Sequence, residues 1–381
     1  MALSKSKSLI IGLLFLGMVG MLAAPVSAAE NEVAAYKVAA PPAIDGKIDD
    51  LWSKAEATTF TTSGGANSGT STVTMKAVYT DTDVYFLVEW TDPTESLRRA
   101  PWQKQADGSW AKLKDPSDKG GDNNLYYEDK LALIWDINVE GFKQQGCFSL
   151  CHAGETGKAF GNKYTPKEGQ LADMWHMKIV RTNPVGYIDD QYVDATRYDP
   201  AKAPEAGRKS DPGAGGYKDN VNEAKTGPAF TADDQPAPPY WILDDQKKPF
   251  ADTYKAGDEI AGIVVKPPTE DRADIKAKAV YSNGKWVMEA GRKLSTGSQY
   301  DVQFSDMKKE YPFGAAVFDN AQVRHSYSGV LKLKFAEEKA PAPTTAAPAA
   351  TPAPKGVCGP TAVLLAGIVP LGLYGLRRRL R

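Results

Sequence analysis

The stretch that decides the fold is VTMKAVYTDTDVYFLVEW, residues 73–90. Its two halves are rich in β-branched and aromatic residues and flank the polar turn Thr80-Asp81-Thr82-Asp83, a pattern that predicts a β-hairpin. Apolar residues recur at every other position of the second half, so one face of that strand is expected to be buried. These residues are Val84, Phe86, Val88 and Trp90.

Further short strands are expected along the rest of the chain, and long helical periodicity is absent. Ser282-Asn283-Gly284 stands between two of these strands and is a strong hairpin signal. The pattern predicts an all-β protein, an antiparallel β-sandwich. The other predicted strands cover residues 131–137, 174–181, 260–265, 275–281, 285–290, 315–318 and 330–335.

Two long segments interrupt the strands. Residues 92–124 and 183–258 are rich in Gly, Pro, Asp and Lys, which makes them too polar for a core and too long for ordinary turns. Loops of this length in a compact domain usually carry function, so these inserted loops are expected to form the rim of a binding site.

The N-terminus has the pattern of a secretory signal. Lys5 and Lys7 precede an apolar run, and small residues with an Ala-x-Ala-like cleavage site follow it. Residues 1–29 are therefore predicted to be a signal peptide, and residues 30–338 the exported main domain.

The C-terminus has the pattern of a membrane tether. Residues 339–357 are mostly Ala, Pro and Thr and predict an extended stalk, and residues 358–381 contain an apolar stretch that ends in several arginines. This tail begins Cys358-Gly359-Pro360 and resembles archaeal sorting segments, which implies processing or lipid attachment at Cys358. The expected location is the outer face of the cytoplasmic membrane or the cell surface.

One short motif carries redox chemistry. Cys147 and Cys151 are followed at once by His152, and two thiols beside an imidazole are what covalent haem attachment requires. The spacing is one residue longer than the usual Cys-x2-Cys-His. The alternatives are a short disulfide between the two cysteines, since exported proteins meet an oxidising compartment, and a metal site.

Charge and motifs exclude several function classes. The formal net charge is −1, from 46 basic and 47 acidic residues, so the chain offers no field for nucleic acid. The sequence contains no Gly-x-Ser-x-Gly, His-Glu-x-x-His or phosphate-binding glycine loop. We therefore predict that the protein is not an enzyme.

Five pieces of sequence occur in a specific order. They are Ile44-Asp45-Gly46 with Trp52, the hairpin of residues 73–90, Asp173-Met174-Trp175-His176-Met177-Lys178, Trp286-Val287-Met288-Glu289 with Arg292, and Ala316-Val317-Phe318-Asp319 before His325. In this order they resemble the haem-binding domain typified by the γ subunit of ethylbenzene dehydrogenase and of related dimethyl sulfoxide reductase-type molybdoenzymes. The resemblance runs over most of residues 40–335 and implies a β-sandwich that holds one haem.

The family has Met and Lys as axial iron ligands, and both positions differ here. The resemblance implies that His152 replaces the family Met, which follows the strand similar to residues 131–137. It also implies that His325 replaces the family Lys, which precedes the last strand. The cofactor is then expected to be one covalently bound haem c, with His152 and His325 on the iron.

His176 is the alternative second ligand. Strand alternation puts His176 and Lys178 on one face and Trp175 and Met177 on the other. His176 and Lys178 could instead bind a haem propionate, and Trp175 and Phe148 are expected to pack against the porphyrin. Thioether ligation by Met174 or Met177 is a further alternative, although strand methionines commonly fill core gaps.

The sequence therefore predicts an exported, membrane-tethered cytochrome that transfers electrons. Its partner is expected to be a redox protein, with the subunits of a molybdenum-containing oxidoreductase as one candidate. Two other classes stay open: a carbohydrate- or ligand-binding module on a surface stalk, which would be colourless, and a haem-based sensor with an open axial site.

Overall fold

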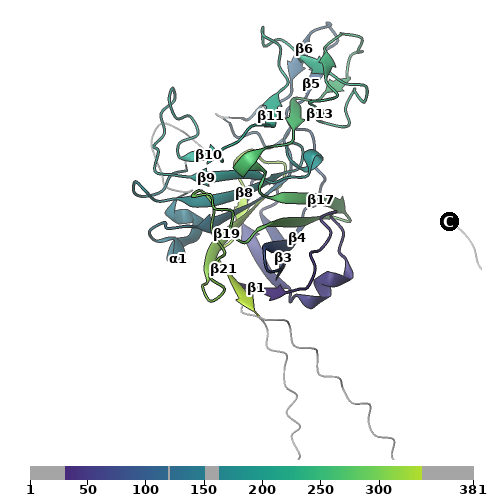
Figure 1. Cartoon of the computed structure of the whole chain (residues 1–381). Coiled ribbons are helices and arrows are strands. Elements are labelled where there is room, and N and C mark those ends of the chain that lie inside the picture. Colours follow the sequence, from purple (N-terminus) through teal and green to yellow (C-terminus); the bar gives the residue numbers. More distant parts are fainter. Residues whose placement is uncertain (1–30, 119–120, 151–162, 337–381) are drawn as a thin grey trace, which may run out of the picture. The chain divides into compact units, whose positions relative to one another are not determined.

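The hairpin of residues 73–90 lies in the middle of one sheet of a β-sandwich (Figure 1). The computed structural model describes residues 31–118, 121–150 and 163–336. Strands β3 (Thr70–Tyr79) and β4 (Asp83–Thr91) pair with Val73 opposite Trp90, and Thr80 N donates to Asp83 O at 2.8 Å in the turn. The buried face of β4 is confirmed, because its four alternating apolar residues are at most 1% exposed.

The hairpin's sheet has the order β2-β3-β4-β18-β17. The β17–β18 turn contains Asn283 and Gly284 at φ of 52° and 76°, and two such positive φ angles match the twist of the flanking strands. The predicted hairpin is therefore confirmed. The bounds are β2 Thr58–Ser63, β17 Lys276–Ser282 and β18 Lys285–Lys293.

The facing sheet has the order β10-β9-β8-β7-β19, and β21 also pairs with β19. Strand β20 joins β19 to β2, and β1 pairs with both β21 and β3, so the two sheets are continuous within the described residues. Figure 1 shows β1 and β21 side by side. The bounds are β1 Glu32–Lys37, β7 Lys130–Asp136, β8 Ala172–Lys178, β9 Asp189–Val193, β10 Arg208–Ser210, β19 Tyr311–Phe318, β20 Ser326–Tyr327 and β21 Leu331–Ala336.

Aromatic side chains fill the space between the two sheets. The Phe86 ring of β4 lies 5.8 Å from the Trp135 ring of β7 and 5.6 Å from the Trp175 ring of β8. Trp135 also stacks on Phe313 of β19 at 4.4 Å. Each side chain of this size contributes about 1.5–3 kcal/mol by burial, so the core holds the sheets together.

The segment around Trp52 covers the outer face of the hairpin's sheet. Trp52 is fully buried, and its Nε1 donates to Glu289 Oε1 at 2.7 Å. The other oxygen of Glu289 accepts the backbone N–H groups of Asp45 and Gly46 at 3.0 and 2.9 Å. One buried carboxylate on β18 therefore fixes the Asp-Gly turn and the tryptophan together.

The two inserted segments are more ordered than predicted. The segment 183–258 contributes β9 and β10 to the main sheet, and residues from both segments build small additional sheets at one end of the sandwich (Figure 1). The additional strands are β5 Trp102–Lys104, β6 Trp110–Lys112, β11 Gly216–Asp219, β12 Phe230–Thr231, β13 Ile242–Leu243, β14 Lys248–Pro249, β15 Glu259–Ile260 and β16 Ile263–Lys266.

The prediction that these segments are too polar for a core is therefore wrong. Ile242 and Ala232 of the segment 183–258 are buried in a cluster with Val264 of the following strand. The predicted strand 260–265 is divided into β15 and β16 at Gly262, where a Cβ atom would lie 2.1 Å from Ala100 O. This close approach of two backbones requires glycine and interrupts the strand.

Helical structure is short in the part of the chain that is described. The elements are the α-helix α1 Phe142–Gln145 and the 3-10 helices η1 Asp50–Lys54, η2 Gly146–Ser149, η3 Asn183–Val185 and η4 Glu270–Ala273. The predicted all-β class is therefore confirmed. The signal peptide, the stalk and the sorting segment lie outside the described residues.

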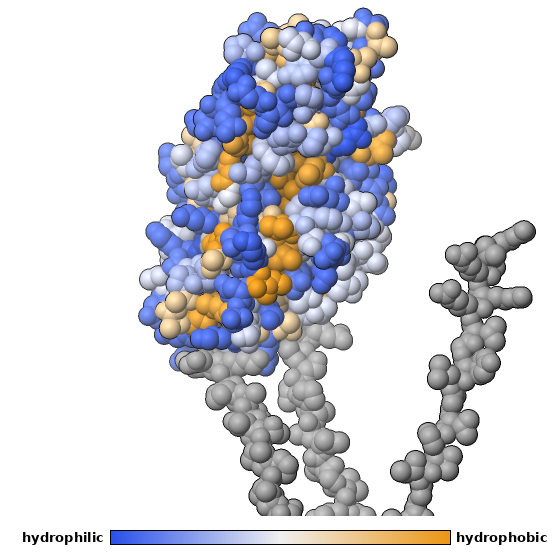
Figure 2. Space-filling view, turned by 90° about the vertical axis from the view of Figure 1, so that its right-hand side faces the viewer, coloured by the Kyte–Doolittle hydropathy of each residue, from blue (hydrophilic) through white to orange (hydrophobic). Residues whose placement is uncertain are grey.

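The surface is mixed in polarity. Figure 2 shows apolar residues gathered in patches on one face, among hydrophilic residues. The large apolar side chains that are exposed among the described residues are Ile48, Leu125, Phe148 and Val280. Of these, Phe148 follows Cys147 directly.

Candidate functional site

Cys147 lies on the outer face of the sheet that contains β19. The short helices α1 and η2 present it there, and it is 7% exposed in a cluster with Ile134 of β7 and Met174 of β8. Gly146 has a φ of 57°, and a Cβ atom there would lie 3.2 Å from the Val330 side chain, so glycine suits the turn before Cys147. Cys151 and His152 lie outside the described residues.

His325 lies next to this turn, although 178 positions separate it from Cys147 in the numbering. The half-buried imidazole directly precedes β20, and its Nδ1 is 2.8 Å from Val323 O. Because a carbonyl oxygen only accepts, Nδ1 carries the proton, and Nε2 is the nitrogen suited to a metal.

Ring contacts connect Phe148 to His325. Phe148 packs edge-on against Tyr327 of β20 with centroids 4.9 Å apart, and the Tyr327 ring is 6.4 Å from the His325 ring. The fold therefore brings the turn that contains Cys147 and the segment that contains His325 to the same place. The expected position of His325, in a connection between two strands, is confirmed.

His176 lies on the same outer face of the sheet as Cys147, and its ring lies next to that of Phe318 of β19. The Phe318 ring is 4.6 Å from His325 and 5.4 Å from His176, measured between centroids. His176 is 8% exposed, and its Nδ1 is 3.4 Å from Gln191 Oε1. Its Nε2 is buried and has no hydrogen-bond partner among the residues that the structure describes.

His176 is held neutral by its surroundings. Burial lowers the pKa of its imidazole well below the usual value, and the nearby Lys178 and Lys130 lower it further. A neutral imidazole with Nδ1–H donated to an amide oxygen has its lone pair on Nε2. That is the form in which histidine binds metals.

Small residues lie between the two histidines and the Cys147 turn. Strand pairing aligns Ala316 of β19 with Ala132 of β7 and His176 of β8, and it aligns Gly314 with Ile134. Ala132 and Ala316 are half-exposed, and a Cβ atom at Gly314 would lie 3.9 Å from Cys147 Cβ. On this face small residues of the sheet lie beside aromatic rings, an arrangement that suits contact with a flat apolar ring.

Lys178 has a different position from the one expected. It shares the outer face of β8 with His176, as the alternation predicted, but its Nζ is buried in an ion pair with Asp189 and lies 2.9 Å from Tyr217 Oη. Arg272 Nη2 binds the same carboxylate at 2.7 Å. Lys178 therefore has an internal counterion, which argues against the predicted contact with a haem propionate.

Trp175 also lies away from the site. It is 1% exposed on the inner face of β8, in the sandwich core, on the side opposite to His176. Met177 belongs to the same core, whereas Met174 packs beside Cys147. The aromatic residues on the histidine face are Phe148, which the sequence also suggested, and Phe318 and Tyr327, whereas Trp175 lies in the core.

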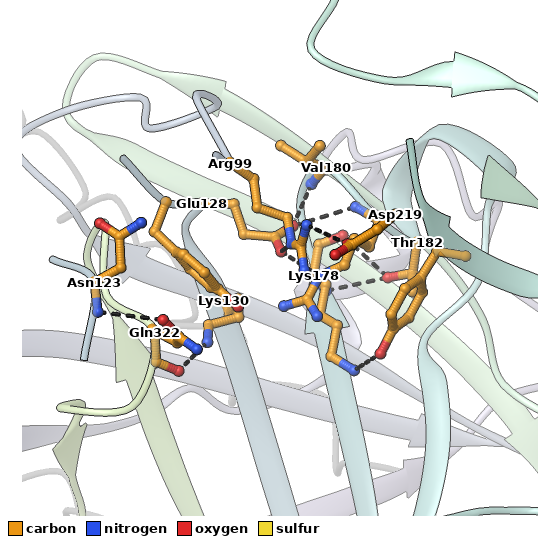
Figure 3. Close-up of polar contacts among 12 residues, drawn as sticks. Arg99, Asn123, Glu128, Lys130, Lys178, Val180, Thr182, Asp219 and Gln322 are labelled. Atoms are coloured by element: carbon orange, nitrogen blue, oxygen red, sulfur yellow. Dashed lines mark hydrogen bonds and ion pairs between the residues drawn. The ribbon is translucent and has the colours of Figure 1, made fainter. Parts of the chain in front are cut away.

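A buried charge network borders the histidines, and sequence patterns gave no indication of it (Figure 3). Glu128 forms an ion pair with Arg181, and the Arg99 Nε lies 3.8 Å from the same carboxylate. The Lys130 Nζ lies 3.9 Å from the Phe318 ring centroid and donates to Gln322 O at 2.8 Å. These cations raise the positive potential around His176.

The inserted segment 92–124 reaches this site through one ion pair. Arg324, the residue before His325, has its Nε 2.7 Å from Asp122 Oδ2. Asn123 N donates to Gln322 Oε1 at 3.2 Å. The end of this segment therefore holds the connection in which His325 lies, in agreement with a role at the rim.

Comparison with known proteins identifies the family. The sequence model of the ethylbenzene dehydrogenase family matches residues 49–329. The chain belongs to this family. No curated protein matches the sequence. The match spans β2 to β20, and it therefore includes Cys147, His176 and His325 of this family member.

Solved structures with a similar arrangement include a carbohydrate binding module of family 9 from Caldicellulosiruptor kristjanssonii. Its complex with cellotriose has 12% identity and a TM-score of 0.32, and the alignment covers 81% of this chain and 95% of that chain. Its complex with glucose has 11% identity and a TM-score of 0.32, with 81% and 99% covered. At these scores the likeness has no bearing on what this family member binds.

The helices in the described part of the chain are short. None of them has the length and the apolar character needed to cross a membrane. The apolar stretch near the C-terminus lies outside those residues.

Proposed function

We propose that this member of the ethylbenzene dehydrogenase family is an exported electron-transfer protein with one haem c. In this proposal Cys147 and Cys151 would hold the porphyrin through thioether bonds, and His152 would bind its iron. The membership of the family supports a place in an oxidoreductase system. The observation that carries the proposal is the contact of the Cys147 turn, through Phe148 and Tyr327, with His325.

The residues on this face fit such a group. Ala316 and Ala132 are small, half-exposed residues of the sheet surface, and the Phe318 and Phe148 rings lie beside this surface. When bound, the haem would supply one-electron redox chemistry. The chain's own residues would bind the iron through imidazole nitrogens and exclude water from the ring.

The second axial ligand is proposed to be His325, with His176 as the alternative. His325 is half-exposed next to Tyr327, and its Nδ1–H is fixed by Val323 O, which orients Nε2. His176 is more deeply buried and has the Nε2 without a partner among the described residues. Both imidazoles contact Phe318, so either one could reach the same ring.

Absorption spectroscopy of two single variants tests this proposal. We expect the purified, reduced protein to show the spectrum of six-coordinate low-spin haem and not to bind carbon monoxide. His325→Ala should convert the iron to a form that binds carbon monoxide, whereas His176→Ala should leave the spectrum unchanged. The reverse result would assign the ligand to His176, and a colourless wild-type protein would refute the proposal.

We also propose that the protein acts at the outer face of the cytoplasmic membrane. The predicted signal peptide and the apolar tail with terminal arginines support this location. A haem with two protein ligands leaves no iron position for a substrate, so the role is to pass electrons to or from a redox protein. Subunits of a molybdenum-containing oxidoreductase are the candidate partner, because ethylbenzene dehydrogenase is the family's named enzyme.

A further inference from the structure

Four aspartates gather at one edge of the sandwich, away from the histidine site. Asp173 of β8, Asp190 of β9 and Asp301 in the β18–β19 connection each place a carboxylate oxygen within 4.8 Å of the others. Asp211, which follows β10, lies beside them, because its backbone N–H donates to Asp190 O at 3.1 Å. All four residues are at most 3% exposed.

Strand pairing explains how the first two carboxylates meet. Trp175 pairs with Asp190 and Asp173 pairs with Tyr192, so Asp173 and Asp190 are diagonal neighbours on the inner face. Tyr192 also stacks on Tyr300 with ring centroids 4.0 Å apart. That stacking holds Asp301, the next residue, against β8 and β9.

The hydrogen bonds of the cluster leave several oxygens unsatisfied. One oxygen of Asp173 accepts from Val302 N at 3.0 Å, and one oxygen of Asp301 accepts from Thr296 Oγ1 at 2.5 Å. The remaining oxygens have no hydrogen-bond partner among the described residues. They are Asp173 Oδ1, Asp301 Oδ1, and both carboxylate oxygens of Asp190 and of Asp211.

One arginine is the counterion on the described part of the chain. Arg292 Nη1 lies 3.0 Å from Asp173 Oδ2 and 4.0 Å from Asp301 Oδ2. Its other N–H groups donate to the carbonyls of Val302 and Lys293. Asp190 forms no ion pair among the described residues, although leaving a buried carboxylate unpaired is very unfavourable.

We propose that Asp173, Asp190, Asp211 and Asp301 bind a calcium ion. The available donors are all carboxylate oxygens, with no histidine or cysteine in the cluster, which favours a hard cation. Calcium takes about 6–8 oxygen ligands with flexible geometry, whereas magnesium usually keeps several waters. A buried site with several unpartnered carboxylate oxygens is therefore better suited to calcium.

A second group of carboxylates shows why the free oxygens matter. Asp92, Asp129 and Asp319 also lie close together. However, Asp129 accepts from Ser96 N at 2.7 Å, Asn320 N at 2.9 Å and Trp286 Nε1 at 3.2 Å. Protein donors already satisfy the Asp129 carboxylate, and Asp92 Oδ2 is the one buried oxygen of this group without a partner among the described residues, so this second group carries no cation proposal.

The bound ion would connect the edges of the two sheets. Asp173, Asp190 and Asp211 belong to the β8-β9-β10 edge, whereas Asp301 belongs to the segment that leaves β18.

Calorimetry and thermal unfolding of the purified full-length protein test this proposal. After removal of metals with EDTA, the protein should bind one calcium ion, and its unfolding midpoint should rise by several degrees when calcium is added. Asp190→Asn should weaken calcium binding by about tenfold or more. The control Asp50→Asn changes an exposed aspartate of η1 and should bind calcium like the wild type.

The stability of Asp190→Asn without calcium shows whether Asp190 binds the ion or only supports the fold. In EDTA this variant should be at least as stable as the wild type, because it removes repulsion between carboxylates, yet calcium should not stabilise it. Wild-type protein with the same midpoint in calcium and in EDTA would overturn the proposal. Unchanged calcium binding by Asp190→Asn would overturn it as well. Neither result depends on whether the protein carries haem.

Discussion

The buried pair of Lys178 and Asp189 shows how single residues shape the site's surroundings. Both side chains are 1% exposed, and Arg272 is a second cation on Asp189. Burial alone would raise the pKa of Asp189, but Lys178 and Arg272 outweigh it and lower that pKa to about 2. The pair therefore fixes β8 next to β9, beside His176.

Removing this carboxylate should destabilise the protein strongly. Asp189→Asn leaves Lys178 and Arg272 buried without a counterion, and we expect a loss of about 3–5 kcal/mol in the free energy of unfolding. Urea unfolding at neutral pH measures this loss. Asp233→Asn, which breaks an exposed pair with Lys248, is the matched control and should unfold like the wild type. Equal stability of the two variants would contradict the role of Asp189 as the buried counterion of Lys178 and Arg272.

The same pair predicts a dependence on pH. The pKa of Asp189 is lowered in the folded state, so its stabilisation is present above the ordinary aspartate pKa and is lost as the pH falls toward about 2. The wild type should therefore lose more stability on acidification than Asp189→Asn. Urea unfolding of both proteins between neutral and acidic pH measures the difference, and parallel curves would refute the prediction.

Strand β8 illustrates what the sequence could and could not predict. Alternation correctly placed His176 and Lys178 on one face and Met177 on the other, because side chains of a strand alternate regardless of their partners. It cannot tell which of these faces turns toward Cys147, and this is why the sequence predicts Trp175 at the site although that residue lies in the core. Only the pairing of β7, β8 and β19 decides that question.

Strand β9 was missed for a related reason. Its sequence Asp189-Asp190-Gln191 is polar and resembles a loop, yet these residues are at most 4% exposed. Lys178 and Arg272 provide the polar partners of Asp189, and His176 provides that of Gln191; all three come from other elements. A polar strand whose partners are distant in sequence cannot be recognised from local patterns.

A large side chain in place of a small residue of β19 should prevent haem from binding at the candidate site. Ala316→Phe would occupy the sheet surface next to His176, and we expect it to lower the haem content sharply while changing the free energy of unfolding by less than about 1 kcal/mol. The ratio of haem absorbance to protein measures this effect. Thr61→Phe adds the same ring to an exposed position of β2, on the other sheet, and should keep the wild-type haem content. Normal haem content in Ala316→Phe would place the haem elsewhere.

Segments that are distant in the sequence meet on the sheet face that contains His176 and His325. The Cys147 turn, the His325 connection and the end of segment 92–124 meet because β7, β19 and β20 are neighbours in the sheet. The sandwich and the position of His325 between strands followed from the sequence, whereas the contacts among Phe148, Tyr327, His325 and Phe318 did not. Such contacts depend on the order of strands in the sheet.

The most direct test of this account is haem staining of the denatured protein after gel electrophoresis, with the maturation machinery present during expression. We expect the wild-type chain to retain haem and Cys147→Ala/Cys151→Ala to lose it, because both thioether bonds would be absent. Cys358→Ala changes the third cysteine and should retain haem. A double variant that keeps its haem after denaturation, or a wild-type chain that carries none, would contradict the account.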